Sequence, residues 1–244
     1  TLLNGSSKID KATAEAIQTL KDNGYEPFIA TGRSPAETRD IMESANIHSG
    51  IFMNGQVVLY QGERVFSSEI PTETVERFHQ MVKEDGYGLT AYNDKEFYLV
   101  ESSAGAKDAY GFIHTNPPAL NADFYKENPI NMMLFISLPP AEDKYKVAFP
   151  NLDFLRNTPY SVDVISKGNS KAEGIKRFLE HLNQKDAETY AFGDGPNDIE
   201  MLQAVTHPVA MGNALPVLKE IAEFITTNNT DNGIVNGLKH YGLI

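Results

Sequence analysis

The sequence predicts an α/β protein with a doubly wound, mostly parallel, Rossmann-like sheet as its core and an inserted α+β domain. At both ends of the chain, short apolar runs alternate with helical patterns. These runs are continuously apolar, which is typical of parallel strands covered on both faces. The middle third instead has short strand-like runs separated by Asn, Asp, Gly and Pro. We therefore expect a core domain of residues 1–70 and 162–244, with residues 71–161 inserted.

The first part of the core is predicted to alternate helix and strand. A helical pattern covers residues 10–23, and a short apolar run at 26–31 indicates a buried strand. Residues 34–37 form a capping box with proline at the first helical position, which predicts a second helix. A second apolar strand follows at 50–53, and a hairpin is expected over 57–66.

The inserted segment begins with a helical pattern over residues 71–86, and strand-like runs at 97–100 and 131–138 follow. The core alternation then returns. A capping box at 170–173 predicts a helix. Further buried strands are expected at 190–192, 208–211 and 224–226, with helices between them.

Composition and charge narrow the classes of function. The 41% apolar content of the 244 residues supports a buried core. The chain has 21 basic and 33 acidic residues, a net charge of −12, which would repel nucleic acid and an anionic membrane. The absence of cysteine excludes disulfides, zinc-thiolate sites and cysteine nucleophiles. With no signal-peptide pattern and no membrane-spanning apolar run, we expect a cytoplasmic protein.

Three predicted core strands end in small polar clusters: Thr31-Gly32-Arg33, Asn54-Gly55 and Gly193-Asp194. Ligands of doubly wound sheets bind outside the carboxyl ends of the strands, so these clusters are expected to share one crevice. Lys171 lies in the first turn of a predicted helix, where free N–H groups favour an anion. Asp194 and Asp198 are four residues apart and supply the oxygen ligands that Mg²⁺ prefers.

Each cluster also has a purely structural interpretation. A Thr-Gly-Arg triplet at a strand end forms an ordinary turn, and Asp194 and Asp198 are able to cap the helix that starts there. The segment Gly193-Asp194-Gly195-Pro196-Asn197-Asp198 begins like a dinucleotide fingerprint. Asp198 occupies its third glycine position, which disfavours a pyrophosphate at this turn.

Taken together, the motifs resemble those of a known family. T-G-R after a strand, an inserted domain, the capped lysine of S-K-A-E, G-D-G-P-N-D-I-E-M-L and A-M-G-N-A follow one another in this order. This order resembles the haloacid dehalogenase (HAD) superfamily of phosphohydrolases, in particular its Cof-like branch with a type IIB cap. The resemblance covers the whole chain and includes Asp231-Asn232-Gly233-Ile234, which is similar to that branch's terminal D-G-[IV] segment.

The resemblance implies a role for each polar cluster around a phosphate. Thr31 and the Gly32 amide would hold the transferring phosphoryl group, and Asn197 would contact it. Lys171 would neutralise its charge and that of the nucleophile. These roles agree with the physics of phosphoryl transfer, which depends on positioning and charge neutralisation.

The resemblance also implies a Mg²⁺ cofactor. Asp194 would coordinate the ion directly, and Asp198 would support it from behind the direct ligands. The catalytic residues would then be Thr31, Lys171 and Asp194. The metal would clamp and neutralise the phosphate while the protein fixes the geometry.

The start of the chain departs from the family pattern. Family members open with a strand ending in D-x-D-G-T-L, whose first aspartate attacks phosphorus and whose second acts as general acid and base. Thr1-Leu2 matches the final T-L, and both aspartates are missing. We expect them just before Thr1, and we expect the 244-residue chain alone to be inactive, because carboxylate catalysis needs that carboxylate.

The expected function is Mg²⁺-dependent hydrolysis of small phosphorylated metabolites, with sugar phosphates the first class to test, through an aspartyl-phosphate. The inserted domain would act as a cap and contact the rest of the substrate, with Tyr87, Tyr92, Asn93 and Tyr98 as candidates for specificity. Two alternatives remain: a phosphosugar phosphomutase with a similar cap, and a noncatalytic sensor of a phosphorylated ligand. The sequence leaves the oligomeric state open.

Overall fold

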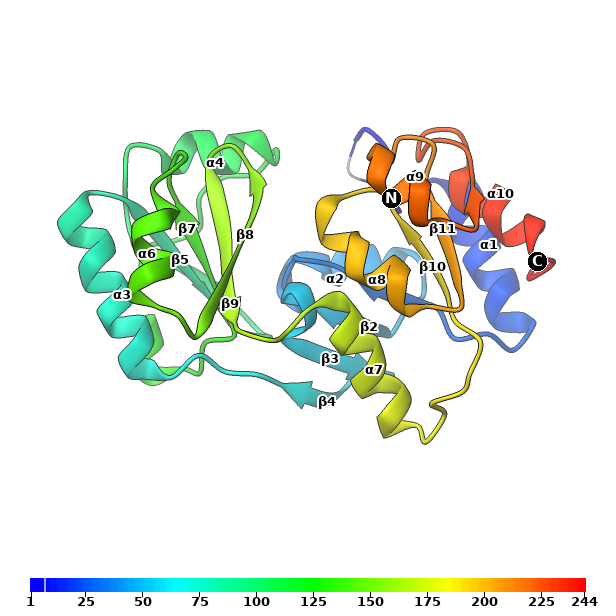
Figure 1. The fold of residues 1–244 in the computed structure, drawn as a ribbon, viewed down its shortest axis with the longest axis horizontal. Helices are drawn as coiled ribbons and strands as arrows, with labels where there is room; N and C mark the ends of the chain where they lie inside the picture. The colour runs from blue at the N-terminus through cyan, green and yellow to red at the C-terminus, as the bar shows by residue number, and fades with distance from the viewer. Residues whose placement is uncertain (7) are drawn as a thin grey trace. The chain divides into compact units, whose positions relative to one another are not determined.

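A computed structural model describes residues 1–6 and 8–244. The described residues divide into two compact units (Figure 1). The first unit comprises Thr1–Thr31, Glu37–Phe66 and Ser170–Ile244. The second unit comprises Gly32–Ala36 and Ser67–Asn169.

One sheet of the first unit has the strand order β1-β2-β3-β4. Its strands are β1 (Phe28–Ala30), β2 (Ser49–Phe52), β3 (Val57–Tyr60) and β4 (Glu63–Ser67). β1 and β2 are parallel, and β2 and β3 are antiparallel. The helices of this part of the chain are α1 (Lys11–Asp22) and α2 (Pro35–Ser44), and the turn η1 (Met53–Gly55) follows β2.

The other sheet of the first unit has the order β10-β11-β12, and its strands are all parallel. These strands are β10 (Tyr190–Gly193), β11 (His207–Ala210) and β12 (Phe224–Ile225). The turn η2 (Pro196–Asp198) follows β10. The helices here are α7 (Lys171–His181), α8 (Ile199–Ala204), α9 (Pro216–Ile221) and α10 (Gly233–His240).

Helix α7 begins where the capping box predicts. The Ser170 Oγ accepts a hydrogen bond from the Glu173 amide at 3.3 Å. On its apolar face, the buried Phe178 packs in one cluster with Ile51 and Val58 of the first sheet. Cap and packing together fix the position of the first residue of α7, Lys171.

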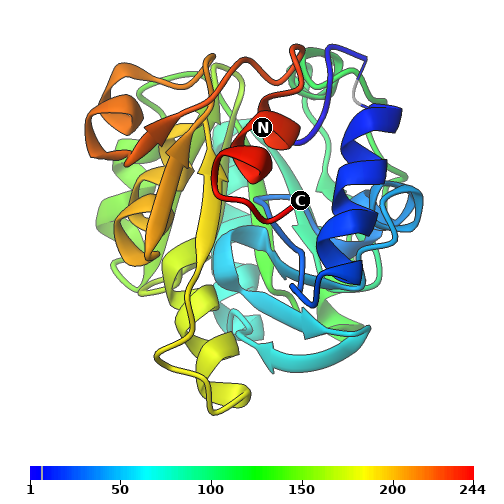
Figure 2. The same ribbon diagram turned by 90° about the vertical axis from the view of Figure 1, so that its right-hand side faces the viewer.

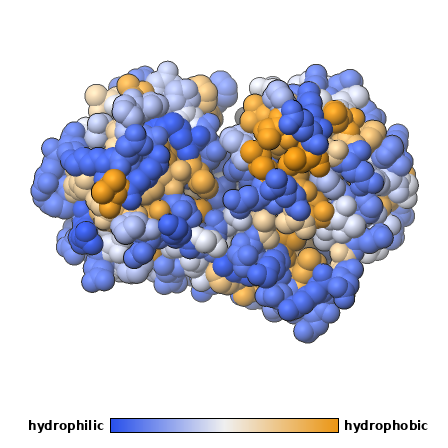
Figure 3. All heavy atoms as spheres, viewed as in Figure 1, coloured by the Kyte–Doolittle hydropathy of each residue, from blue (hydrophilic) through white to orange (hydrophobic). Residues whose placement is uncertain are grey.

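The two ends of the chain meet in the first unit. Helices α1 and α10 lie side by side in both ribbon views (Figures 1 and 2). Ala16 of α1 and Leu238 of α10 belong to the same buried apolar cluster. On the face seen in Figure 3, apolar residues gather over α8 and α9, and the nearby Leu215 and Val217 are exposed.

The second unit is built around an antiparallel sheet with the order β6-β5-β7-β9-β8. Its strands are β5 (Gly88–Tyr92), β6 (Phe97–Glu101), β7 (Met132–Ile136), β8 (Leu152–Thr158) and β9 (Ser161–Ser166). Its helices are α3 (Thr72–Asp85), α4 (Ala106–Phe112), α5 (Phe124–Glu127) and α6 (Glu142–Ala148). Phe135 packs with Phe78 and Tyr145 of α3 and α6, while the next residue, Ile136, packs with Tyr110 of α4. Successive residues of β7 therefore pack into separate apolar clusters on the two faces of this sheet.

The predicted α/β architecture is confirmed, and the structure adds detail to it. The parallel strands of the first unit lie in two sheets, because no described strand joins β1 to β10. The predicted domain boundary between residues 161 and 162 falls inside β9, which pairs with β7 and β8 along its length. Helices α4 and α6 were not predicted, because seven residues are too few to display a clear helical period. The assignment of core and cap roles stays a prediction.

Within the described part of the chain, no helix is long and apolar enough to cross a membrane.

Candidate active site

A buried ion pair lies at the centre of the candidate site. The Lys171 Nζ lies 2.7 Å from the Asp198 Oδ1, and each of the two side chains is only 6% exposed. The Asp198 Oδ2 accepts hydrogen bonds from the amides of Asp194 and Gly195, at 2.9 and 3.0 Å. Both oxygens of Asp198 are therefore used inside the protein, one holding the lysine and the other the loop after β10.

Gly193 makes this arrangement possible. A Cβ atom at this residue would lie 2.7 Å from the Cβ of Asp198. That separation is far shorter than non-bonded carbon atoms allow. A glycine at the end of β10 thus lets Asp198 approach the strand closely enough to bind the loop amides.

Asp194 is the more accessible carboxylate of the loop, with 28% of its side chain exposed. The Asn213 Nδ2 donates to its Oδ2 at 2.8 Å, the Thr1 backbone nitrogen lies 3.0 Å from the same oxygen, and the Thr1 hydroxyl donates to Oδ1. Burial acts to raise the pKa of Asp194, but hydrogen bonds from the Thr1 hydroxyl and the Asn213 amide act in the opposite direction, and that pKa lies below its ordinary value. The Asp194 side chain is thus an ionised carboxylate in a fixed orientation.

A chain of amide groups extends from Asp194 to the first residues of the protein. The Asn213 Oδ1 accepts from the Asn229 amide at 3.0 Å, and the Asn229 Nδ2 donates to the Leu3 carbonyl at 2.8 Å. Sequence reasoning gave neither asparagine a role. The signal available for Asn213 was its place in A-M-G-N-A, a motif used only to identify the family.

Thr31 and Asn197 are brought to one place by Asn54. The Thr31 amide donates to the Ile51 carbonyl at 2.8 Å, and its own carbonyl accepts from the Asn54 amide at 3.1 Å. The Asn54 Oδ1 accepts from the Asn197 Nδ2 at 3.0 Å. Gly32 is bonded covalently to Thr31, but it falls in the second unit, so its predicted phosphate contact stays a prediction.

The donor set fits a hard divalent cation. Mg²⁺ in proteins is usually held by one or two carboxylates, keeps several waters and shares phosphate oxygens with the substrate. Asp194 offers the more exposed carboxylate, whereas Asp198 is buried and holds Lys171 and the loop amides. In residues 1–6 and 8–244, no three His, Asp or Glu side chains are clustered to hold an ion by themselves. The Asp194 carboxylate therefore fits the chemistry of a metal that shares ligands with a substrate.

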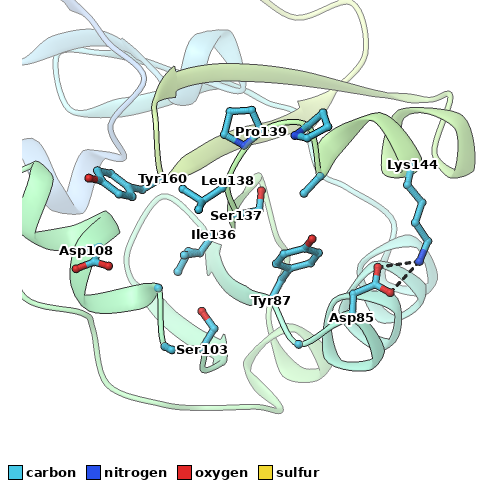
Figure 4. A pocket seen from close by; sticks show the side chains of 15 residues that line it. Asp85, Tyr87, Ser103, Asp108, Ile136, Ser137, Leu138, Pro139, Lys144 and Tyr160 are labelled. Carbon is cyan, nitrogen blue, oxygen red and sulfur yellow. Dashed lines mark hydrogen bonds and ion pairs between the residues drawn. The ribbon is translucent and has the colours of Figure 1, made fainter.

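A separate pocket lies within the second unit. It has a volume of about 750 Å³ and is lined by Tyr87, Ser137, Tyr160 and the paired side chains of Asp85 and Lys144, among others (Figure 4). The Lys144 Nζ lies 2.8 Å from each oxygen of Asp85. None of the residues predicted to bind phosphate or metal lines this pocket.

Comparisons with known proteins agree on one family. The family model described as haloacid dehalogenase-like hydrolase matches residues 1–238. A Bacillus subtilis (strain 168) protein named "Putative phosphatase YkrA" is 34% identical over 245 residues, covering 100% of this chain and 95% of the relative. The crystal structure of a hypothetical protein from Geobacillus kaustophilus HTA426 superposes with a TM-score of 0.93 at 31% identity, covering 100% and 96% of the two chains. A HAD subclass IIB sugar phosphatase superposes with a TM-score of 0.86 at 28% identity and the same coverage.

Proposed function

The chain belongs to the family of haloacid dehalogenase-like hydrolases and is a phosphoric monoester hydrolase, and we propose that it hydrolyses small phosphorylated metabolites with Mg²⁺ as cofactor. Sugar phosphates are the first class to test, because a structural relative with full coverage is named a sugar phosphatase. The observation that carries the proposal is the buried Lys171–Asp198 pair beside the Asp194 carboxylate. A fixed cation and a metal-binding acid are the groups that a transferring phosphate requires.

In this proposal the protein's own residues position and neutralise the phosphoryl group. Thr31 and the Gly32 amide hold it, and Asn197 contacts one of its oxygens. Lys171 neutralises charge on the phosphate and on the nucleophile through N–H donors not used on Asp198. When bound, Mg²⁺ would be held by Asp194, with Asp198 behind it, and would supply further neutralisation of phosphate charge.

The nucleophile is proposed to be an aspartate preceding Thr1. The Thr1 nitrogen lies 3.0 Å from the Asp194 Oδ2, so a residue bonded to that nitrogen would lie beside the site. The carboxylate oxygen of the first aspartate attacks phosphorus, and the bond from phosphorus to the ester oxygen breaks. The second aspartate gives its proton to the leaving alcohol. It then takes a proton from the water that hydrolyses the aspartyl-phosphate and releases inorganic phosphate.

We also propose that the inserted domain, residues 71–161, acts as the cap that selects the substrate. This assignment is supported by the second unit having its own apolar core. Contacts to the part of the substrate that is not phosphate would come from this domain and would determine the differences in kcat/KM between esters.

The test is release of inorganic phosphate from a panel of sugar, flavin, pyridoxal and aryl phosphates, with MgCl₂ and with EDTA. Three proteins are compared: the 244-residue chain, the chain with the family's D-x-D-G segment ahead of Thr1, and a matched control with N-x-N-G. Mg²⁺-dependent release by the D-x-D-G protein alone is expected. Equal release by the 244-residue chain or by the control would overturn the proposed nucleophile. Transfer between positions of a sugar without free phosphate would indicate a phosphomutase instead.

A further inference from the structure

The turn after β2 has an unusual backbone. Met53, Asn54 and Gly55 have φ angles of 50°, 54° and 94°, so consecutive residues adopt the left-handed region. Non-glycine residues adopt this region rarely. Met53 is fully buried and Asn54 is 1% exposed, so contact with water does not stabilise this backbone conformation. Backbone strain of this kind persists only where the surrounding structure enforces it, and it gathers at functional sites.

The same turn contacts the elements that carry the proposed phosphate-binding groups. Through its backbone amide, Asn54 donates to the Thr31 carbonyl at 3.1 Å. Through its side-chain oxygen, it accepts from Asn197 at 3.0 Å, across 143 residues of sequence. At Gly55, a Cβ atom would lie 2.1 Å from the Ser170 carbonyl oxygen, so the turn presses against the residue that caps the Lys171 helix. Only glycine allows this approach.

Packing alone does not account for the side chain of Asn54. A left-handed position in a core turn is satisfied by glycine, which has no steric penalty there. Asn54 instead places a carboxamide in a site that is 99% withdrawn from solvent, and its oxygen receives the Asn197 amide. A buried polar group without a hydrogen-bond partner destabilises a fold. Orientations of Asn54 and Asn197 that keep their hydrogen bond are therefore favoured over those that break it.

We propose that Asn54 is a positioning residue of the phosphate site. It orients the Asn197 side chain toward the phosphoryl group, and its strained turn sets the positions of Thr31 and of the first turn of α7. The inference rests on the proposed function, since it assumes that Asn197 contacts phosphate. Asn54 acts through Asn197 and is not itself placed in contact with the reacting atoms.

Asn54→Gly is the informative variant, because it keeps the left-handed backbone and removes only the carboxamide. In the enzyme carrying the D-x-D-G segment, we expect kcat/KM to fall about 10- to 100-fold, the scale of a misplaced substrate contact. The inhibition constant of inorganic phosphate is expected to rise, while the thermal unfolding midpoint stays close to that of the wild type. A purely structural role would instead lower the unfolding midpoint and leave phosphate affinity unchanged.

A double-mutant cycle that combines Asn54→Gly with Asn197→Ala tests whether the activity lost in Asn54→Gly is lost through Asn197. If Asn54 acts through Asn197, the double variant loses no more kcat/KM than Asn197→Ala alone. Additive losses would overturn the proposal.

A second variant, Asn54→Ala, also removes the carboxamide but places a Cβ atom at a left-handed position. Its matched control is Asn183→Ala, since Asn183 is an exposed left-handed asparagine with φ of 54°. Both alanine variants should be less stable, but only Asn54→Ala should lose activity.

Binding of inorganic phosphate, measured calorimetrically with Mg²⁺ present, separates this inference from the proposed function. Wild-type protein that binds phosphate without hydrolysing any ester would contradict the proposed function only. Weaker binding by Asn54→Gly would then still support the inference. Equal binding by wild type and Asn54→Gly would overturn the inference, whatever the wild type hydrolyses.

Discussion

The Lys171–Asp198 pair of the first unit and the Glu142–Arg156 pair of the second are both largely withdrawn from solvent, but they use their donors differently. Arg156 donates to both oxygens of Glu142, at 2.7 and 2.6 Å, and to the Ser137 and Pro159 carbonyls. Among the described residues, Asp198 is the hydrogen-bond partner of the Lys171 Nζ. An ammonium group has three donors, so two remain for a ligand.

This difference separates a structural ion pair from a site. The Arg156 guanidinium has its donors satisfied by protein acceptors and joins the loop after β7 to the turn before β9. Lys171 is more deeply buried but not saturated, and its partner Asp198 accepts from the amide of the partly exposed Asp194. Burial and charge are common to both pairs, and the remaining N–H donors of Lys171 distinguish the pair that we propose to bind phosphate.

The largest expected effect is that of Lys171→Met, made, like the variants that follow, in the enzyme carrying the D-x-D-G segment. Loss of a charge-stabilising group should lower kcat about 10²- to 10³-fold. It also leaves the Asp198 charge buried without its partner, which should lower the free energy of unfolding by about 3–5 kcal/mol. Phosphate release and urea denaturation measure the two effects. The Lys171→Met/Asp198→Asn double variant should recover stability without recovering activity, and recovered activity would contradict the role given to Lys171.

Asn213→Ala tests whether the amide chain behind Asp194 supports metal binding. Removing a group that orients a metal ligand should weaken Mg²⁺ affinity about 10- to 100-fold. The measurement is the Mg²⁺ concentration that gives half-maximal activity, together with direct calorimetric titration of the ion. KM for the ester at saturating Mg²⁺ should change little. Unchanged Mg²⁺ affinity would make Asn213 an ordinary loop residue.

Glu142→Gln tests whether the Glu142–Arg156 pair stabilises the fold without affecting activity. The variant loses the charge of a pair whose side chains are 10% and 19% exposed, and we expect a loss of about 1.5–3 kcal/mol in unfolding free energy. Activity at a temperature where the protein is folded should stay within about twofold of wild type. The check is urea denaturation with a phosphate-release assay, and a large fall in kcat without loss of stability would contradict the structural role.

The smallest expected effect is the pH dependence of this same pair. The Arg156 hydrogen bonds hold the pKa of Glu142 below its ordinary value of 4.5. A carboxyl whose pKa is lowered by folding stabilises the protein above its unfolded pKa, and this contribution is lost as the pH falls through the folded pKa. The difference in urea midpoint between wild type and Glu142→Gln should therefore be full above about pH 5 and shrink below pH 4.5. A difference that grows on acidification would contradict this linkage.

Local patterns in the sequence predicted most of the elements that carry the candidate site. The capping box at Ser170, the strand before Gly193 and the apolar run before Asn54 depend on residues that are close together along the chain. The strand-end rule then indicated that the clusters share a crevice. Thr31, Asn54 and Asn197 do meet in the first unit, whereas the contact of Gly32 with phosphate stays a prediction.

What the sequence could not predict are the pairs formed across long separations. Lys171 binds Asp198 across 27 residues, Asn197 binds Asn54 across 143, and Asn229 binds the Leu3 carbonyl across 226. Asparagine is common in turns for local reasons, so its residue type does not reveal a distant partner. Likewise, the sequence placed Asp194 and Asp198 together at a metal but did not show that every oxygen of Asp198 is bound within the protein.

By itself the sequence determined the α/β class, the alternation of strand and helix at both ends of the chain and the family motifs, because caps, apolar periods and strand-end residues act over a few neighbours. The tertiary structure alone decided which polar groups saturate one another and which keep free donors or an exposed oxygen. Lys171 and Arg156 are both cations in the chain, and the packing around them shows that Arg156 donates to several protein acceptors whereas Asp198 is the acceptor for Lys171 among the described residues. Hydrogen-bond saturation depends on three-dimensional neighbours, and that is the physical reason why the sequence could name candidate residues but not the hydrogen bonds between them.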